Sequence, residues 1–205
     1  MFGYQKTGGI DMRWQRVVAV SILAVGVSAP IKAEPLYNKP VYNPVSKSYF
    51  ELYSPDATDP KKRPVPLSGP IEWIHAAKMA PKKILHGVRG RLAVVNTPQI
   101  HEFLRKTFQP AGPVWIGLRF WCRYNKLQWV TGEIHARGNF QKWGRFWNQS
   151  AGSPQPRPQR AQCPKNKKHT LGVHYWGVGD GFFWNANGRF KQFNALFIEY
   201  STGKK

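Results

Sequence analysis

This 205-residue chain contains few acidic residues. It contains ten Asp and Glu residues against 31 Lys and Arg residues, which gives a formal charge of +21. Acid–base catalysis and calcium binding both draw on carboxylates. No paired-carboxylate, Ser/His/Asp or Cys/His spacing stands out in the chain. We therefore predict that the protein is not an enzyme.

Cysteine is also scarce. Cys122 and Cys163 are the only two, and two isolated cysteines without a C-x-x-C pair make poor zinc ligands. The six histidines show no metal-ligand spacing such as H-E-x-x-H. The sequence therefore predicts neither a metal site nor a cofactor.

Membrane-spanning runs are missing as well. The one extended apolar stretch, residues 17–29, is shorter than the ~20 residues that cross a hydrocarbon core. Arg13 and Arg16 precede it, and the small-residue segment 31–33 follows it, which is the pattern of a cleaved signal peptide. We expect residues 1–33 to be this leader. An uncleaved anchor and a buried apolar element of a cytosolic protein are the alternatives.

An exported protein of this kind would reach the periplasm, the outer surface or the medium. Met12 stands just before the basic residues and is an alternative start. Residues 1–33 carry four basic residues and Asp11, a net +3, which leaves +18 for the remainder. A field of that sign attracts nucleic acid, anionic lipid head groups, lipopolysaccharide and acidic glycans. Behind a leader, envelope or extracellular polyanions are favoured; a surface charged only for solubility is the alternative.

Proline marks the organisation of the rest of the chain. Eight prolines lie between residues 34 and 70. Because proline blocks helix interiors and removes a backbone donor, residues 34–46 are expected to form an extended arm. We assign residues 47–201 to one domain and residues 202–205 to a basic tail.

Two helices are expected in that domain. Residues 71–83 place Trp73 and three alanines on one face, and a second helix begins at Asn96 or Thr97 with Pro98 at its first position. A long polar loop follows the middle of the chain, over residues 144–166. Strands are predicted at residues 49–53, 91–95, 114–120, 127–130, 171–176, 182–184 and 195–200.

The order of these elements carries a resemblance. The strand at residues 115–118 reads Trp-Ile-Gly-Leu, Trp184-Asn185 follows the long loop, and residues 197–200 read Phe-Ile-Glu-Tyr. In this order they resemble a C-type lectin-like domain of exported bacterial type, across about residues 47–201. Further matching residues are Trp73, Ala76-Ala77, Gly90, Leu92-Ala93, Glu102-Phe103, Trp129, Gly132, Trp143 and Cys163. The resemblance implies an α+β fold, with two helices packed on small antiparallel sheets and a long irregular loop region.

The calcium site of sugar-binding members is not reproduced. Their loop motif corresponds here to Gln155-Pro156-Arg157, and their strand motif to Trp184-Asn185-Ala186. Calcium takes six to eight oxygen ligands, several of them carboxylates. Arg157 and Ala186 replace such ligands, and residues 160–162 hold no acid. The resemblance therefore implies a domain that does not bind calcium.

The cysteines depart from the family pattern too. Cys163 fits the loop position, but Arg189 and Ile198 stand where its partners are expected, and Cys122 is not a usual family position. An even pair in an exported chain still favours a bond. We predict a Cys122–Cys163 disulfide, because the strand after Leu118 and the long loop are both expected on one side of the domain.

Three functions remain open. The first is an exported lectin-like module that binds a glycan, an anionic polysaccharide or lipopolysaccharide without calcium. The second is a protein-interaction or structural envelope module; the third, a nucleic-acid binder, requires the leader to be misread. For the first, Trp residues would stack on a sugar, although core packing is the alternative, and Asn185 would donate or accept a hydrogen bond, unless it serves only a turn. The expected ligand-binding residues, on the loop face of residues 144–168 and 176–189, are Trp147, Gln155, Arg157, Arg160, Trp184, Asn185 and Arg189.

Overall fold

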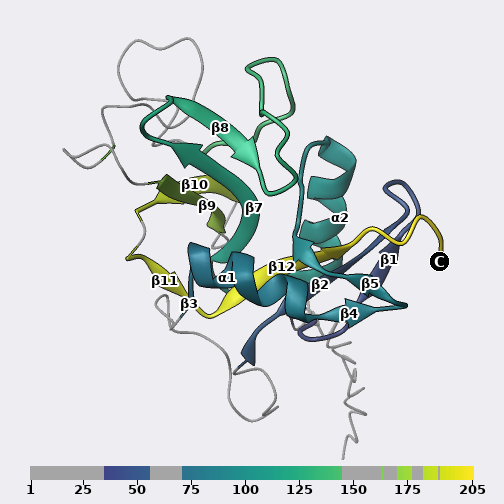
Figure 1. The fold of residues 1–205 in the computed structure, drawn as a ribbon. Coiled ribbons are helices and arrows are strands. Elements are labelled where there is room, and N and C mark those ends of the chain that lie inside the picture. The colour runs from purple at the N-terminus through teal and green to yellow at the C-terminus, as the bar shows by residue number, and fades with distance from the viewer. Residues whose placement is uncertain (1–34, 56–70, 145–162, 164–169, 177–181, 189) are drawn as a thin grey trace, which may run out of the picture. The chain divides into compact units, whose positions relative to one another are not determined.

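The computed structural model describes residues 35–55, 71–144, 163, 170–176, 182–188 and 190–205 (Figure 1). All of them belong to one contact unit, Ala33–Lys205. The expected leader, residues 56–70 of the Pro-rich segment and nearly all of the long loop lie outside the described residues.

An eight-stranded mixed sheet forms the centre of the fold. Its strand order is β1-β2-β12-β7-β9-β10, with β6 also paired to β12 and β8 to β7. All pairs are antiparallel except β7 with β12, which run parallel. The strands are β1 Val41–Asn43, β2 Ser48–Tyr53, β6 Arg91–Leu92, β7 Val114–Trp121, β8 Lys126–Trp129, β9 Thr170–Trp176, β10 Phe183–Asn187 and β12 Ala195–Tyr200.

Two helices pack on opposite faces of this sheet (Figure 1). They are α1, Trp73–Met79, which continues into the 3-10 turn η2, Ala80–Lys82, and α2, Pro98–Phe108. The predicted α+β fold with two helices is confirmed, although its main sheet is larger and mixed. Within the described ranges, no helix is both long and apolar enough to cross a membrane. The short pairs are β3 Ile71–Glu72 with β11 Gln192–Phe193, and β4 Ile84–Leu85 with β5 Val88–Arg89.

The start of α2 follows its sequence signal. The Thr97 hydroxyl accepts a hydrogen bond from the Ile100 amide at 3.2 Å, and Pro98 occupies the first helical turn, where its missing N–H costs nothing. The helix ends at Gln109, which is left-handed with φ 43°. Thr97 is thus the N-cap, one of the two predicted starts.

The first helix is shorter than predicted. Ile71 and Glu72 are extended as β3, because they pair with β11 from the far end of the chain. The helix then begins at Trp73, and Pro81 lies in the 3-10 turn that ends it. The predicted apolar face is present, since Trp73 and the alanines at 76 and 80 are buried.

The described part of the proline-rich arm contains one strand. Residues 41–43 form β1, which pairs with residues 48–50 of β2. The arm thus adds an edge strand to the main sheet.

Two apolar clusters cover the two faces of the sheet. The α2 side contains Ile116, Leu118 and Trp129, and the α1 side contains Trp73 and Trp115. On the α1 side each indole is fixed by a backbone carbonyl: Nε1 of Trp73 donates to the Ile116 oxygen, and Nε1 of Trp115 donates to the Ile71 oxygen, both at 2.8 Å. These bonds lock α1 and β3 onto β7.

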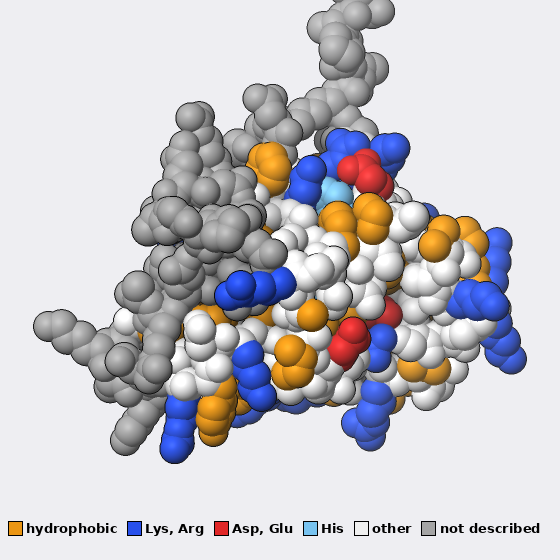
Figure 2. All heavy atoms as spheres, turned by 90° about the horizontal axis from the view of Figure 1, so that it is seen from above, with side chains coloured by type: hydrophobic (Ala, Val, Ile, Leu, Met, Phe, Trp, Pro, Cys, Tyr) orange, Lys and Arg blue, Asp and Glu red, His pale blue; other side chains and the backbone are white. Residues whose placement is uncertain are grey.

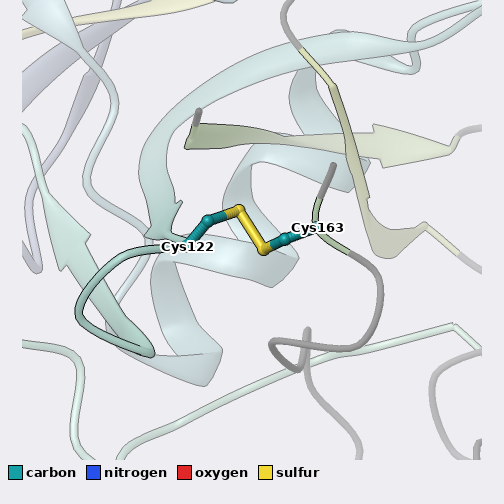
Figure 3. Close-up of a disulfide and its surroundings, with 2 residues drawn as sticks. All are labelled: Cys122 and Cys163. Carbon is teal, nitrogen blue, oxygen red and sulfur yellow. A yellow bond between two sulfur atoms is a disulfide. The ribbon is translucent and has the colours of Figure 1, made fainter. Parts of the chain in front are cut away.

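The Cys122–Cys163 disulfide is confirmed (Figure 3). The two Cα atoms lie 5.8 Å apart, within the range that a disulfide spans. Cys122 follows β7 and is fully buried, whereas Cys163 packs against the same apolar cluster from the long loop. The bond therefore anchors one point of that loop beside the end of β7.

Candidate ligand-binding surface

Four neighbouring strands present one half-exposed polar face, on the side of the sheet that α1 partly covers. In one row Arg119 lies between Gln128 and Gly172, and Gly172 is paired with Asn187. In the next row Trp121 lies between Lys126 and Thr170. We call this surface the four-strand face. It comprises Arg119, Trp121, Lys126, Gln128, Thr170, Gly172, Trp176, Phe183, Asn185 and Asn187.

The helix side chain Trp73 borders this face. A Cβ on Gly172 would lie 2.5 Å from the Cβ and Cγ of Trp73, so only glycine lets the indole approach the strand. Beyond it, His174 and Trp115 are covered by Phe193, whose ring centroid lies 4.5 Å from each of theirs. The remaining positions of the face stay half-buried or exposed.

Arg119 is the most unusual group on the face. Its guanidinium carbon lies 4.0 Å from the centroid of the Trp121 ring and 5.6 Å from that of Trp73. Its Nε is buried and has no hydrogen-bond partner. Burial lowers the pKa of Arg119, although a guanidinium stays charged at physiological pH. Among the described residues, no carboxylate lies within salt-bridge distance of it.

Trp121 is held in place by an amide relay. Its Nε1 donates to Oε1 of Gln128 at 2.7 Å, and Nε2 of Gln128 donates to the Gly132 carbonyl at 2.8 Å. The relay fixes the orientation of an indole that is itself half-buried. A ring with an accessible surface and a fixed orientation is suited to stacking on a flat ligand.

The turn between β7 and β8 extends this surface with further cations and an aromatic ring. Tyr124 is 59% exposed, and its ring centroid lies 6.3 Å from that of Trp121. The Arg123 guanidinium carbon and the Lys126 ammonium lie 5.6 and 5.4 Å from the Tyr124 centroid. Such distances are typical of cation–π contacts at exposed sites.

The other end of the face, on β9 and β10, is rich in amides. The Asn185 Oδ1 accepts a hydrogen bond from the Ala186 amide at 2.8 Å, and Oδ1 of Asn187 lies 3.3 Å from Nε2 of His174. Phe183 has the Lys142 ammonium 5.5 Å from its ring centroid, and Trp176 is 39% exposed. Aromatic, amide and cationic groups therefore meet here as well.

Carboxylates are absent from all four strands: β7, β8, β9 and β10, each described in full, contain no Asp or Glu. Three described acids outside these strands are in ion pairs, among them Glu199, which accepts two hydrogen bonds from Arg91 at 2.9 and 3.2 Å. Lys and Arg side chains are mixed with hydrophobic ones on the surface that Figure 2 shows, and acidic side chains are sparse there. The face lies in a positive field.

Two buried histidines lie on opposite sides of the sheet: His174 on β9 lies beside the face, and His101 lies on α2. Burial lowers the pKa of His174 to about 4, although hydrogen bonds to the Tyr175 carbonyl and to Asn187 oppose the shift. Burial likewise lowers the pKa of His101 to about 4, and its Nδ1 lies 2.9 Å from the Tyr175 hydroxyl. Both imidazoles are neutral at physiological pH, so they add no charge to the surface.

The predicted site residues divide into two groups. Trp184 is fully buried: its ring contacts those of Trp129 and Trp143 at 6.0 and 5.5 Å, so the prediction that it offers a stacking face is wrong. The alternation of side chains along β10 turns Trp184 into the core and Asn185 onto the four-strand face. The other predicted ligand-binding residues, Trp147, Gln155, Arg157, Arg160 and Arg189, lie outside the described residues.

Sequence reasoning missed the Arg119 cluster. The signal was present as alternation along residues 115–121, where Trp, Gly, Arg and Trp occupy every second position. Recognising it required the register, because Gln128 and Lys126 complete the cluster only when β8 pairs with β7.

A metal centre finds no support in the described part of the chain, where no group of three His, Cys, Asp or Glu residues could hold an ion. Ala186, at the position where the family motif carries an acid, is 7% exposed and packs in the core. The residues present do not fit a calcium ion at this strand.

The element order of the structure is the one that the resemblance implies. The Trp-Ile-Gly-Leu segment lies in β7 after α2, Trp184-Asn185 lies in β10 after the long loop, and Phe-Ile-Glu-Tyr closes the sheet as β12. The fold is C-type lectin-like. No protein-family model matches the sequence, and no curated protein matches it.

Solved structures do match. One is the C-type lectin CEL-I from Cucumaria echinata, with 16% identity, a TM-score of 0.45, and coverage of 74% of this chain and 89% of that chain. Another is the cow C-type carbohydrate-recognition domain of CD23, with 17% identity, a TM-score of 0.48, and coverage of 82% and 96%. The Ca2+-independent C-type lectin SPL-2 from Saxidomus purpuratus matches with 17% identity, a TM-score of 0.47, and coverage of 76% and 87%. At these identities the matches carry no information about ligands.

Proposed function

We propose that this protein is an exported, non-enzymatic binding module that recognises anionic glycans without calcium. One observation carries the proposal: the four-strand face combines arginine, lysine, amide and aromatic side chains, and its four strands contain no carboxylate. Such a surface attracts an anion, and none of its four strands carries an acidic side chain that would repel it.

The chemistry of these groups matches an acidic sugar. A guanidinium donates two parallel hydrogen bonds to a carboxylate or sulfate group, and an indole or phenol ring stacks on the apolar face of a pyranose. Amides such as Asn187 suit hydroxyl groups, because they both donate and accept hydrogen bonds. The basic surface would raise the rate of association with a polymer such as an acidic polysaccharide or lipopolysaccharide.

The long loop is proposed to complete the site. The disulfide anchors Cys163 beside the end of β7, at the residue that follows Trp121. We expect the loop residue Trp147 to contribute a further stacking ring, and Gln155, Arg157 and Arg160 to contribute further hydrogen bonds. Arg189, which follows β10 in the sequence, is expected to contribute one more. Disulfides persist in oxidising compartments, which supports export to the periplasm, the outer surface or the medium.

The test is a glycan array, read with and without chelator and at two salt concentrations. We expect acidic glycans to bind equally in chelator, and binding to weaken at high salt, because exposed charges are screened beyond about 8–10 Å at physiological ionic strength. Binding of neutral glycans only, or binding lost in chelator, would contradict the proposal. A protein that binds no glycan would favour the protein-interaction or structural role. A protein that binds only nucleic acid would favour the role of a nucleic-acid binder.

Variants separate a site from diffuse charge. Arg157→Glu should weaken binding more than Lys62→Glu in the Pro-rich segment, although both positions lie outside the described residues. Equal losses would indicate a diffuse charge effect. Binding that survives Arg157→Glu combined with Trp147→Ala would remove the loop from the site.

A further inference from the structure

Arg119 is a partly desolvated cation without a counter-ion among the described residues. Two other described arginines have one: Arg91 pairs with Glu199 at 2.9 Å, and Arg105 pairs with Glu102 at 2.7 Å. Arg119 has two indole rings instead, and its buried Nε has no acceptor. A charge taken out of water is costly unless it is paired and hydrogen-bonded.

We infer that Arg119, Trp121 and Gln128 form a subsite for one oxyanion group, a carboxylate or a sulfate ester, carried on a sugar ring. The inference deepens the proposed function and rests on it for the identity of the ligand as a glycan. The anion would take hydrogen bonds from the Arg119 fork, and the ring that carries it would lie on the half-buried Trp121 indole.

The subsite is held rigid before any ligand arrives. Trp121 is fixed by its hydrogen bond to Gln128, and Gln128 by its own bond to the Gly132 carbonyl. The Arg119 guanidinium lies near both Trp121 and the buried Trp73 of α1, whose Nε1 donates to the Ile116 carbonyl of β7. A preorganised donor loses less conformational entropy on binding than a free surface side chain does.

Neighbouring groups favour an anion at this position. Lys126 is directly opposite Trp121 across the β7–β8 pair, and Arg123 lies in the turn beside Tyr124. On the other side Thr170 supplies a hydroxyl opposite Trp121. A polymer with an anionic group on successive sugars could therefore meet Arg119 first and the cations of the turn next.

The first test needs no glycan. We would titrate 15N-labelled protein with sodium sulfate, against sodium chloride of equal ionic strength, and follow the arginine Nε–H and tryptophan Nε1–H resonances by NMR. Arg119, identified by the signal that Arg119→Lys removes, and Trp121 should shift in a saturable way. Arg89 on β5, which is exposed, should not. If Arg119 moves no more than Arg89, the subsite is overturned.

The second test measures affinity for a sulfated oligosaccharide, an oligouronate and a neutral oligosaccharide of equal length. Arg119→Gln should weaken binding of both acidic ligands at least about tenfold, the size expected for losing charge-assisted hydrogen bonds. The matched control Arg89→Gln should change the affinity for both acidic ligands less than about twofold. Gln128→Glu, which places a carboxylate opposite Arg119, should weaken it as Arg119→Gln does, whereas Gln192→Glu on β11 should not.

The two tests fail separately. A sulfate shift at Arg119 in a protein that binds no acidic glycan would refute the proposed function and leave the anion subsite standing. Acidic-glycan binding that responds equally to Arg119→Gln and Arg89→Gln would refute the subsite and leave the proposed function standing. A difference between the sulfated and the uronate ligand would identify which oxyanion the subsite prefers. Thermal unfolding of each variant checks that the fold is retained.

Discussion

Gly117 shows why the Trp-Ile-Gly-Leu segment has its glycine. A Cβ at this position would lie 2.7 Å from the Leu92 carbonyl oxygen and 2.9 Å from that of Ala93. The same backbone donates from Gly117 to Ala93 at 2.8 Å and accepts from Val130 at 2.7 Å. The backbone of β7 therefore lies in close contact with the segment after β6, and the glycine of the motif is needed for this contact.

Gly117→Ala should lower the free energy of unfolding by about 1–3 kcal/mol, the usual cost of overpacking a core. The two carbonyl oxygens among the nearest atoms belong to the backbone and cannot rotate away as a flexible side chain would. Urea unfolding measures the change. Gly138→Ala, where a Cβ would meet nothing within 4 Å, is the control and should leave stability nearly unchanged.

The buried histidines predict an acid-sensitive fold. An unfolded histidine titrates near pH 6.5, whereas burial lowers the pKa of His174 and that of His101 to about 4. Because the unfolded chain binds the proton first, the unfolding free energy is highest above pH 6.5 and falls as the pH drops towards 4. The loss is at most about 1.4 kcal/mol per pH unit for each histidine.

Urea unfolding at a series of pH values between 7 and about 5.5 measures this slope above the range in which most carboxylates titrate. His174→Gln should flatten it, and His75→Gln, on the exposed side of α1, should not. A wild-type slope of zero over this range would show that burial does not depress these pKa values.

The Cys122–Cys163 disulfide connects the main sheet covalently to the long loop. It joins the residue after β7 to a residue 41 positions later. A bond that closes a loop of this length removes many conformations from the unfolded chain. Its contribution to stability is therefore expected to be large relative to the few kcal/mol that separate folded from unfolded states.

The double variant Cys122→Ala/Cys163→Ala should lose about 4 kcal/mol of unfolding free energy by the chain-entropy argument. Urea unfolding of the variant, beside reduced wild-type protein, gives the number, and the two should agree. Equal stability of the variant and the oxidised wild type would mean that the loop is fixed by other contacts.

Elements with strong local signals could be predicted, and those that depend on distant partners could not. The start of α2 is encoded by Thr97 and Pro98, and β7 and β12 by long apolar runs. The two-residue strands β3 and β11 exist only because residues 71–72 and 192–193 meet. For the same reason the Arg119 cluster was missed: its members come from two strands, and only their register brings them together.

The molecule as a whole carries a charge that shapes what it can bind. Its excess of positive charge and its carboxylate-free central strands both disfavour a divalent cation. A ligand that binds only the folded state raises its stability by RT ln(1 + [L]/Kd). A change of melting temperature on adding calcium therefore tests whether the calcium site of sugar-binding family members is retained.

We expect calcium and chelator to leave the melting temperature unchanged, when sodium chloride of the same ionic strength is the control. Calorimetry should detect no calcium affinity tighter than ~1 mM, the weak end of extracellular calcium sites. A melting temperature that rises with calcium alone would contradict the assignment.

The place of β12 in the sheet has a consequence for how the protein is made. This strand, residues 195–200, pairs with β2, β6 and β7, and so joins segments from the start and the middle of the domain. The main sheet of the domain cannot be completed until these residues leave the ribosome. Pairings so distant in sequence form more slowly than local ones. The apolar strands that pair with β12 therefore stay open to chaperones until β12 has been synthesised.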